Sequence, residues 1–401
     1  MNFKSKKNLE YKKWWNFPFL IYILPNALMS AFVYLFGILF VDGVPIPFAQ
    51  NSIILLYVFL LILLSYFFIK KVSFYFYNLA NKYDDSKPSK YVGYIIFILQ
   101  LIDLASLLLL DFGRVGGVAL SNNIVAVFIS YIPSDILFLL YYGHIRKYKV
   151  PFYNLGIFMF LNLLKGWTAI FVILFLIEIY FLLYKYPYKK IVKRGLLFFF
   201  IVIFLYPSID KFKFFIRGGE EYKGGTLIES LSILMTRLQH ATNAILIFQE
   251  RVTIQNAITK NEIYPYYLDN RFGNYLIPNN SLSLQKYLSV NYLIDRNVIG
   301  KAADLEEYSW NTHIGITGWF LILDKVQLMF YLLFITVLLM LPFLINHFFL
   351  KAKDILPVIQ TLVFIYLFHG WFTVQFSFIF GVILYVFLCG MFRRKYKSDL
   401  E

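Results

Sequence analysis

The sequence is built from long apolar stretches separated by short clusters of Lys and Arg, and one long polar segment interrupts it. A stretch of about 20 apolar residues is enough to cross the hydrocarbon core of a bilayer, and many stretches here approach or exceed that length. The chain is 60% hydrophobic, well above the roughly 45–50% of typical soluble domains. The sequence therefore predicts an all-α polytopic membrane protein.

We expect ten membrane-spanning helices, at residues 17–40, 51–69, 91–110, 123–142, 152–164, 167–184, 195–209, 326–349, 355–371 and 373–391. The apolar stretch that begins at residue 17 is too long for a cleavable signal peptide, which indicates a retained first span. Residues 1–209 then hold seven spans, residues 210–325 form one large polar segment, and residues 326–401 hold three spans and a tail.

The distribution of charge predicts the orientation in the membrane. Of the 38 Lys and Arg residues, 24 fall in the six segments that share a side with the N-terminus. The short loops on the other side carry only Arg114 and Lys165. Because basic residues concentrate in cytoplasmic loops, we expect both termini in the cytoplasm and residues 210–325 in the periplasm. The net charge of +15 then reflects membrane topology, and we expect no nucleic-acid partner.

The polar segment contains the pattern of a long amphipathic helix. A capping-box spacing at residues 226–229 precedes apolar residues that recur at alternating intervals of four and three, which predicts a helix over 226–258. At about 100° per residue, Arg237, His240 and Arg251 would share one edge of it. That edge could face an opening between spans, and it also fits an ordinary solvated helix surface.

Ionisable residues within apolar stretches are costly and indicate function. Asp103, Asp135 and Glu178 are of this kind. A second group consists of cations close to glycines at the predicted periplasmic ends of the spans. These are Arg114, Lys165 and Arg217. Each cation alone fits a contact with lipid headgroups. Together with Arg237 they favour an anion site, and a lipid pyrophosphate is the anion expected at that depth.

Several chemistries lack their motifs. The sequence has no Walker motif, no GxSxG, no HExxH and no Cys/His spacing for zinc, and its one cysteine is Cys389. The first outer loop, residues 41–50, lacks a pair of acids. We therefore expect no cofactor and no metal.

The layout resembles the O-antigen (polysaccharide repeat-unit) polymerases, which are related to the O-antigen ligases. The resemblance covers the whole chain as ten spans, cytoplasmic termini, one large external loop and external arginines. Its local support lies in four stretches, at Phe112–Gly117, Lys165–Trp167, Ile216–Gly219 and Thr236–His240. It implies a GT-C-like fold, undecaprenyl-pyrophosphate-linked glycan substrates, contact with membrane lipids, no metal, and a chain-length regulator as a protein partner.

The resemblance also suggests roles for residues. Pyrophosphate binding would fall to Arg237 and Arg217, assisted by Arg114, Lys165 and Arg251. The base that deprotonates the acceptor hydroxyl would be His240 or His313, with the carboxylates of Asp111, Glu220 and Glu221 as further alternatives. Two other functions stay open: an O-antigen ligase, with His313 as the late histidine of the loop, and a flippase or transporter of lipid-linked oligosaccharides.

Overall fold

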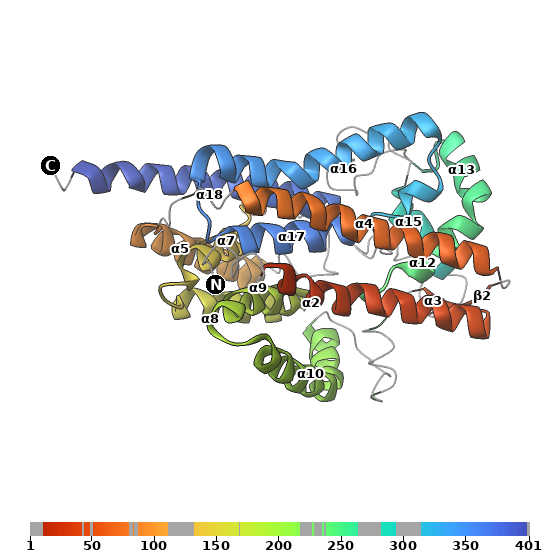
Figure 1. The fold of residues 1–401 in the computed structure, drawn as a ribbon, viewed down its shortest axis with the longest axis horizontal. Coiled ribbons are helices and arrows are strands. Elements are labelled where there is room, and N and C mark those ends of the chain that lie inside the picture. The colour runs from red at the N-terminus through yellow and green to blue at the C-terminus, as the bar shows by residue number, and fades with distance from the viewer. Residues whose placement is uncertain are drawn as a thin grey trace.

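The computed structural model describes residues 11–41, 44–48, 51–79, 83, 87–110, 132–167, 169–216, 227, 235, 238–263, 282–293 and 314–398. This part of the chain is mostly helical, and several of its long helices run along one axis of the molecule (Figure 1). The helices that lie wholly or mostly outside residues 210–325 are α2 (Asn16–Pro18), η1 (Phe19–Ile23), α3 (Leu24–Phe36), α4 (Ser52–Leu79), α5 (Lys90–Leu110), α7 (Ser134–Arg146), α8 (Phe152–Leu164), α9 (Ala169–Lys185), α10 (Tyr188–Ile216), α16 (Lys325–Ile345), η7 (Asn346–Leu350), α17 (Leu356–Phe368) and α18 (Phe372–Ser398). Smaller elements are α12 (Ala241–Gln249), α13 (Arg251–Thr259), α15 (Leu284–Leu288), η3 (Ser289–Leu293) and η6 (Trp319–Leu321).

Within these described residues, six helices are long and apolar enough to cross a membrane, namely Tyr11–Phe36, Ser52–Leu79, Lys90–Leu109, Tyr188–Ile209, Lys325–Leu350 and Phe372–Phe392. The prediction of a membrane protein built from helices is thus supported, while the count of ten spans is not confirmed. The predicted spans at 152–164 and 355–371 correspond to the 13-residue helices α8 and α17. Thirteen residues rise about 20 Å, less than the roughly 30 Å hydrocarbon core.

The predicted first span ends earlier than expected. Its helix stops at Phe36, and a two-stranded antiparallel hairpin follows, with β1 (Ile38–Val41) paired to β2 (Val44–Pro47). Leu39 and Val41 are buried, because alternate residues of a strand face the same side. The apolar run ILFV reads equally well as the end of a span, so no strand was predicted there.

Two short helices, α7 and α17, form the interior of the bundle. Every residue of α17 is buried, as is α7 from Ser134 to Ile145 apart from Asp135. A helix that is apolar on all sides belongs inside other helices, and α17 packs on α4, α7, α9, α16 and α18. Small residues allow the close approach. A Cβ at Gly381 of α18, for example, would lie 2.6 Å from Ile136 of α7.

Side-chain hydrogen bonds tie the helices together across long sequence distances. The indole of Trp14 donates to the carbonyl of Leu176 at 2.8 Å, and the hydroxyl of Tyr66 donates to the carbonyl of Trp15 at 2.7 Å. The amide of Gln375 donates to the carbonyl of Leu338 at 2.9 Å. Apolar burial gives little net drive between helices in lipid, so such bonds and close packing carry the association.

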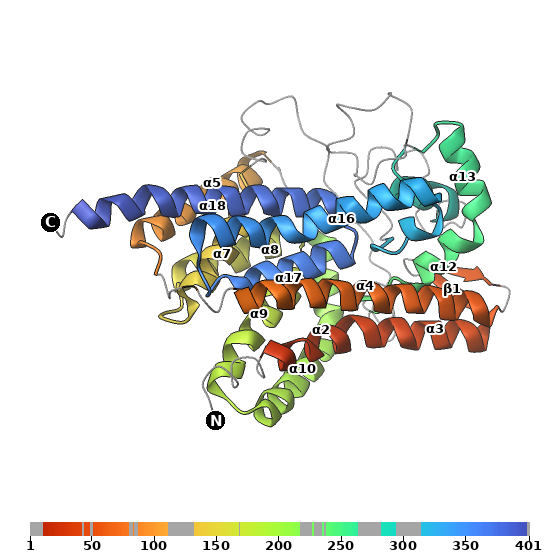
Figure 2. The ribbon, with the colours of Figure 1, turned by 45° about the horizontal axis from the view of Figure 1, so that its top comes forward.

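The elements around the polar segment gather at one end of the bundle. Figures 1 and 2 both place α12 and α13 at the end where α3 and the hairpin lie, and α12 packs on α3, α4 and β1. The prediction of one unbroken helix over 226–258 is wrong at two points. Gln239 and His240 are not helical, and a turn at Glu250 separates α12 from α13.

A local side-chain hydrogen bond accompanies the first break. The Gln239 side chain accepts from the backbone N–H of Thr242 at 3.0 Å, so it starts a new helix at Ala241. His240 therefore sits at the N-terminus of α12, and it does not share a helix edge with Arg251.

The turns at Gly315 and Gly370 generate a prediction for the fold. Both residues have left-handed backbones, with φ +64° and +70°, and a Cβ at Gly370 would meet the Gly315 carbonyl oxygen at 2.9 Å. Gly370→Ala should lower the free energy of unfolding by at least about 1–2 kcal/mol. Gly156→Ala is the control, because a Cβ on α8 there meets nothing within 4 Å. Unfolding in detergent measures both, and equal stability of the two variants would contradict the account.

Candidate functional site

The polar segment is joined to the first span through the start of α12. The side-chain oxygen of Asn26, on α3, accepts hydrogen bonds from the backbone N–H groups of His240 and Ala241, both at 2.8 Å. The side-chain nitrogen of Asn26 donates to the Tyr22 carbonyl at 2.7 Å. A residue of the first span thus caps a helix of the polar segment, since the first N–H groups of a helix lack partners within it.

Three further contacts close this junction. The Thr242 hydroxyl donates to the carbonyl of Phe40 in β1 at 2.7 Å. The backbone N–H of Ile316 donates to the carbonyl of Phe368, at the end of α17, at 3.2 Å. The Tyr331 hydroxyl donates to the Ile316 carbonyl at 2.7 Å. The junction therefore brings together the first span, the hairpin, α12, the chain after residue 314 and α17.

The imidazole of His240 lies at the centre of this junction. Its ring is 4.6 Å from that of His369 and nearly perpendicular to it, and His369 in turn stacks on Trp371 at 4.6 Å. His240 is 1% exposed, and within the described part of the chain neither of its ring nitrogens has a hydrogen-bond partner. Burial lowers the pKa of His240 to about 3, so the ring is neutral at pH 7. Such a ring can accept a hydrogen bond from a group that enters the junction.

His369 is a member of this cluster that the sequence analysis did not select. It falls inside the predicted span 355–371, and its neighbour in space, His240, lies 129 positions away in the chain. The available signal was the sequence His369-Gly370-Trp371, because a glycine and polar aromatic residues at the end of an apolar run mark a helix terminus.

Lys165 lies in a separate site with two acids. Its ammonium nitrogen is 2.9 Å from a carboxylate oxygen of Asp103 on α5 and 3.0 Å from one of Asp135 on α7. Ser134 donates to Asp103 at 2.6 Å, and Asn162 donates to Asp135 at 3.0 Å. The three charged side chains are only 14–18% exposed. We call Asp103, Asp135 and Lys165 the acid–lysine triad.

The triad corrects the role predicted for Lys165. As a pyrophosphate ligand it would need a free positive charge, whereas two carboxylates here leave the triad with one net negative charge. The acids Asp103 and Asp135 were each read as functional on their own. In the structure they hold the end of α8 against α5 and α7, and the sequence could not show that all three meet.

The third acid of the apolar stretches, Glu178, also has a partner. It receives two hydrogen bonds from the Arg146 guanidinium, both at 2.7 Å, and one from the Tyr142 hydroxyl at 2.6 Å. This fork-to-fork geometry is typical of strong ion pairs. The carboxylate raises the pKa of Arg146 further above its usual range. Glu178 thus links α9 to α7.

The other predicted site residues fall into two groups. Arg251 is exposed at the start of α13, with its guanidinium 5.3 Å from the ring centre of Phe248. Arg114, Arg217, Arg237 and His313 lie outside the described residues, as do Asp111, Glu220 and Glu221. The predicted convergence of cations therefore stays a prediction. Among the described residues, no three His, Cys, Asp or Glu side chains are grouped so as to hold a metal ion.

No family model matches the chain, and it matches no curated protein and no solved structure. Function is therefore inferred from the residues and their geometry.

The buried imidazole predicts a pH-dependent stability. The folded-state pKa of His240 is about 3, below the ordinary value of about 6.5, so between these values the unfolded chain binds more protons than the folded one. Stability should fall by about 1.4 kcal/mol per pH unit as pH drops below 6.5. His240→Gln cannot titrate, and its stability should change less between pH 6.5 and 5. Unfolding in detergent at several pH values measures this, and parallel curves for the two proteins would contradict it.

The acid–lysine triad predicts a strong asymmetry between single and combined variants. Lys165→Ala leaves two buried carboxylates unpaired and should lower the free energy of unfolding by about 3–5 kcal/mol. Lys165→Met combined with Asp103→Asn and Asp135→Asn removes every charge and should recover most of that loss. Unfolding measurements on both variants test the triad. If the single variant is as stable as the wild type, the ammonium does not balance these acids.

Proposed function

We propose that the protein is a polymerase of the O-antigen class, which joins undecaprenyl-pyrophosphate-linked oligosaccharide repeat units on the periplasmic face of the inner membrane. The observation that carries the proposal is the junction around His240. An enzyme that acts on a lipid-linked sugar needs its reactive groups at headgroup depth. The capping of α12 by Asn26 joins the start of the polar segment to the first candidate span, Tyr11–Phe36, so residues that would act on such a sugar are held against a span.

The proposed reaction exchanges one bond at an anomeric carbon. A hydroxyl of the incoming repeat unit attacks the anomeric carbon of the growing chain, a new glycosidic C–O bond forms, and the C–O bond to undecaprenyl pyrophosphate breaks. The hydroxyl proton passes to a base, and the electron pair leaves with the pyrophosphate. Because the leaving group is already good, the protein has mainly to position the acceptor and stabilise the developing charge.

The residues divide this work by their chemistry. The guanidinium group of arginine can form bidentate hydrogen bonds with a phosphate. Arg237, Arg217 and Arg114 are therefore the proposed pyrophosphate ligands. His240 is the proposed base, since its ring is neutral and both of its nitrogens lack a hydrogen-bond partner among the described residues. His313 is the alternative base. Lys165 is left out of the binding set because of its two carboxylates.

Deletion of the gene in its own host tests this function. Surface polysaccharide run on a gel should lose its ladder and show lipid A core that carries a single repeat unit. Arg237→Ala should give the same pattern at an unchanged protein level, because a pyrophosphate ligand is lost. Lys260→Ala is the control, since it removes an exposed cation at the end of α13.

Other outcomes point to the rival functions. Polymer that accumulates on undecaprenyl pyrophosphate and never reaches lipid A would make the protein a ligase. Repeat units trapped on the cytoplasmic side would make it a transporter. A full ladder from the Arg237→Ala variant would reject the arginine as a ligand.

A further inference from the structure

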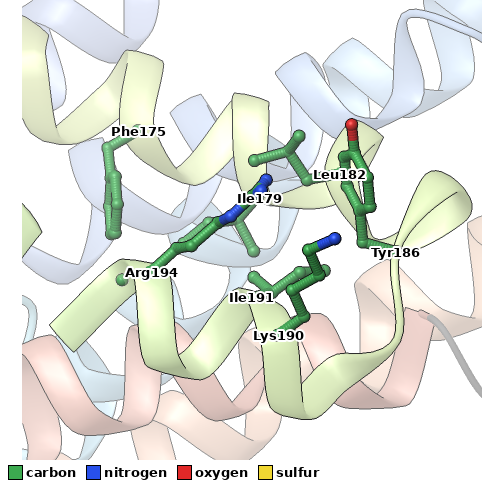
Figure 3. A pocket seen from close by; sticks show the side chains of 8 residues that line it. Phe175, Ile179, Leu182, Tyr186, Lys190, Ile191 and Arg194 are labelled. Atoms are coloured by element: carbon green, nitrogen blue, oxygen red, sulfur yellow. The ribbon is translucent and has the colours of Figure 1, made fainter. Parts of the chain in front are cut away.

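A pocket opens between α9 and α10, away from the junction around His240. Its volume is about 230 Å³. Figure 3 shows Phe175, Ile179 and Leu182 of α9 on one side, with Lys190 and Arg194 of α10 opposite them and Tyr186 at one end. The pocket thus combines an apolar wall with two cations.

The two cations are held close together on one aromatic ring. The Lys190 ammonium lies 5.1 Å and the Arg194 guanidinium 5.2 Å from the ring centre of Tyr186. Both side chains are exposed, and they stand four residues apart on one face of α10. Like charges at that spacing repel each other on a helix. An anion placed between them would remove the repulsion and gain two charge-assisted hydrogen bonds.

No acid of these two helices neutralises the pair. The sequence has no Asp or Glu between Glu178 and Asp210. The Glu178 carboxylate is already bound by Arg146 and Tyr142 of α7. Among the described residues, therefore, no acid pairs with the two cations that line the pocket beside its apolar wall.

The position of the pocket fits a lipid of the inner leaflet. The segment 185–194 is one of the basic segments that the distribution of charge places in the cytoplasm. Anionic lipids give that leaflet a negative surface, and basic pockets between helices bind their headgroups. A cavity of about 150 Å³ holds benzene, so the larger volume here admits part of an acyl chain.

We propose that this pocket binds one anionic phospholipid of the cytoplasmic leaflet. Lys190 and Arg194 hold the phosphate, and an acyl chain lies against Phe175, Ile179 and Leu182. Only 12% of the apolar stretch of α10 is buried in the protein, so the lipid supplies contact between α9 and α10. Because α10 runs on to Ile216 next to the polar segment, the lipid also fixes the helix that leads there. The inference is independent of the proposed function.

Native mass spectrometry of the full chain tests the site with phosphatidylglycerol, phosphatidylcholine and inorganic phosphate as probes. Lys190→Gln with Arg194→Gln removes both phosphate ligands. Lys189→Gln with Lys193→Gln is the matched control, since these exposed residues precede them by one position and do not line the pocket. Gly195→Phe fills the pocket without a change of charge, and a Cβ there meets nothing within 4 Å.

The wild type and the matched control should retain one phosphatidylglycerol. The Lys190/Arg194 variant should bind it about tenfold or more weakly, and Gly195→Phe should weaken it as well. Equal loss in both charge variants would overturn the proposal in favour of diffuse attraction to the basic surface. Equal retention of phosphatidylcholine, or displacement of the lipid by inorganic phosphate, would also overturn it.

Discussion

The hydrocarbon core of a bilayer contains no water that could hydrogen-bond to a polar group, so the partner of that group must lie within the protein. The acid–lysine triad is the strongest instance of this constraint, because it places one ammonium between two carboxylates from different helices. It fixes α5, α7 and the end of α8 relative to one another. Since α7 also packs on α17 and α18, the interior of the bundle depends on this arrangement.

A second use of the same rule occurs where the first span meets α12. Asn26 satisfies two backbone N–H groups at the start of α12, and thereby builds the polar segment into the bundle. Both nitrogens of the His240 ring lack a hydrogen-bond partner among the described residues, as do several other buried atoms such as the hydroxyls of Tyr11 and Tyr366. A buried polar group without a partner is costly, and proteins retain such a cost at sites that receive a ligand. The proposed chemistry is placed there for this reason.

The sequence predicted the parts of the fold that depend on composition. The apolar stretches and the position of the polar segment needed only hydropathy, and most helices fall where it put them. The hairpin after Phe36 was not predictable from the sequence, because the four apolar residues of its first strand fit a strand and a helix equally well. Two long-range contacts were also not predictable: the contact of His240 with His369, and the ion pairs of Lys165 with Asp103 and Asp135. Both depend on which helices become neighbours, and no local spacing encodes that.

The most direct test of the proposed function is chain elongation by the purified protein alone. The protein would be placed in lipid vesicles with undecaprenyl-pyrophosphate-linked repeat units as the only glycan, and product length and released undecaprenyl pyrophosphate would be measured over time. The account predicts a growing ladder, with one undecaprenyl pyrophosphate released for each new linkage. Repeat units that stay single in the presence of folded protein would contradict it.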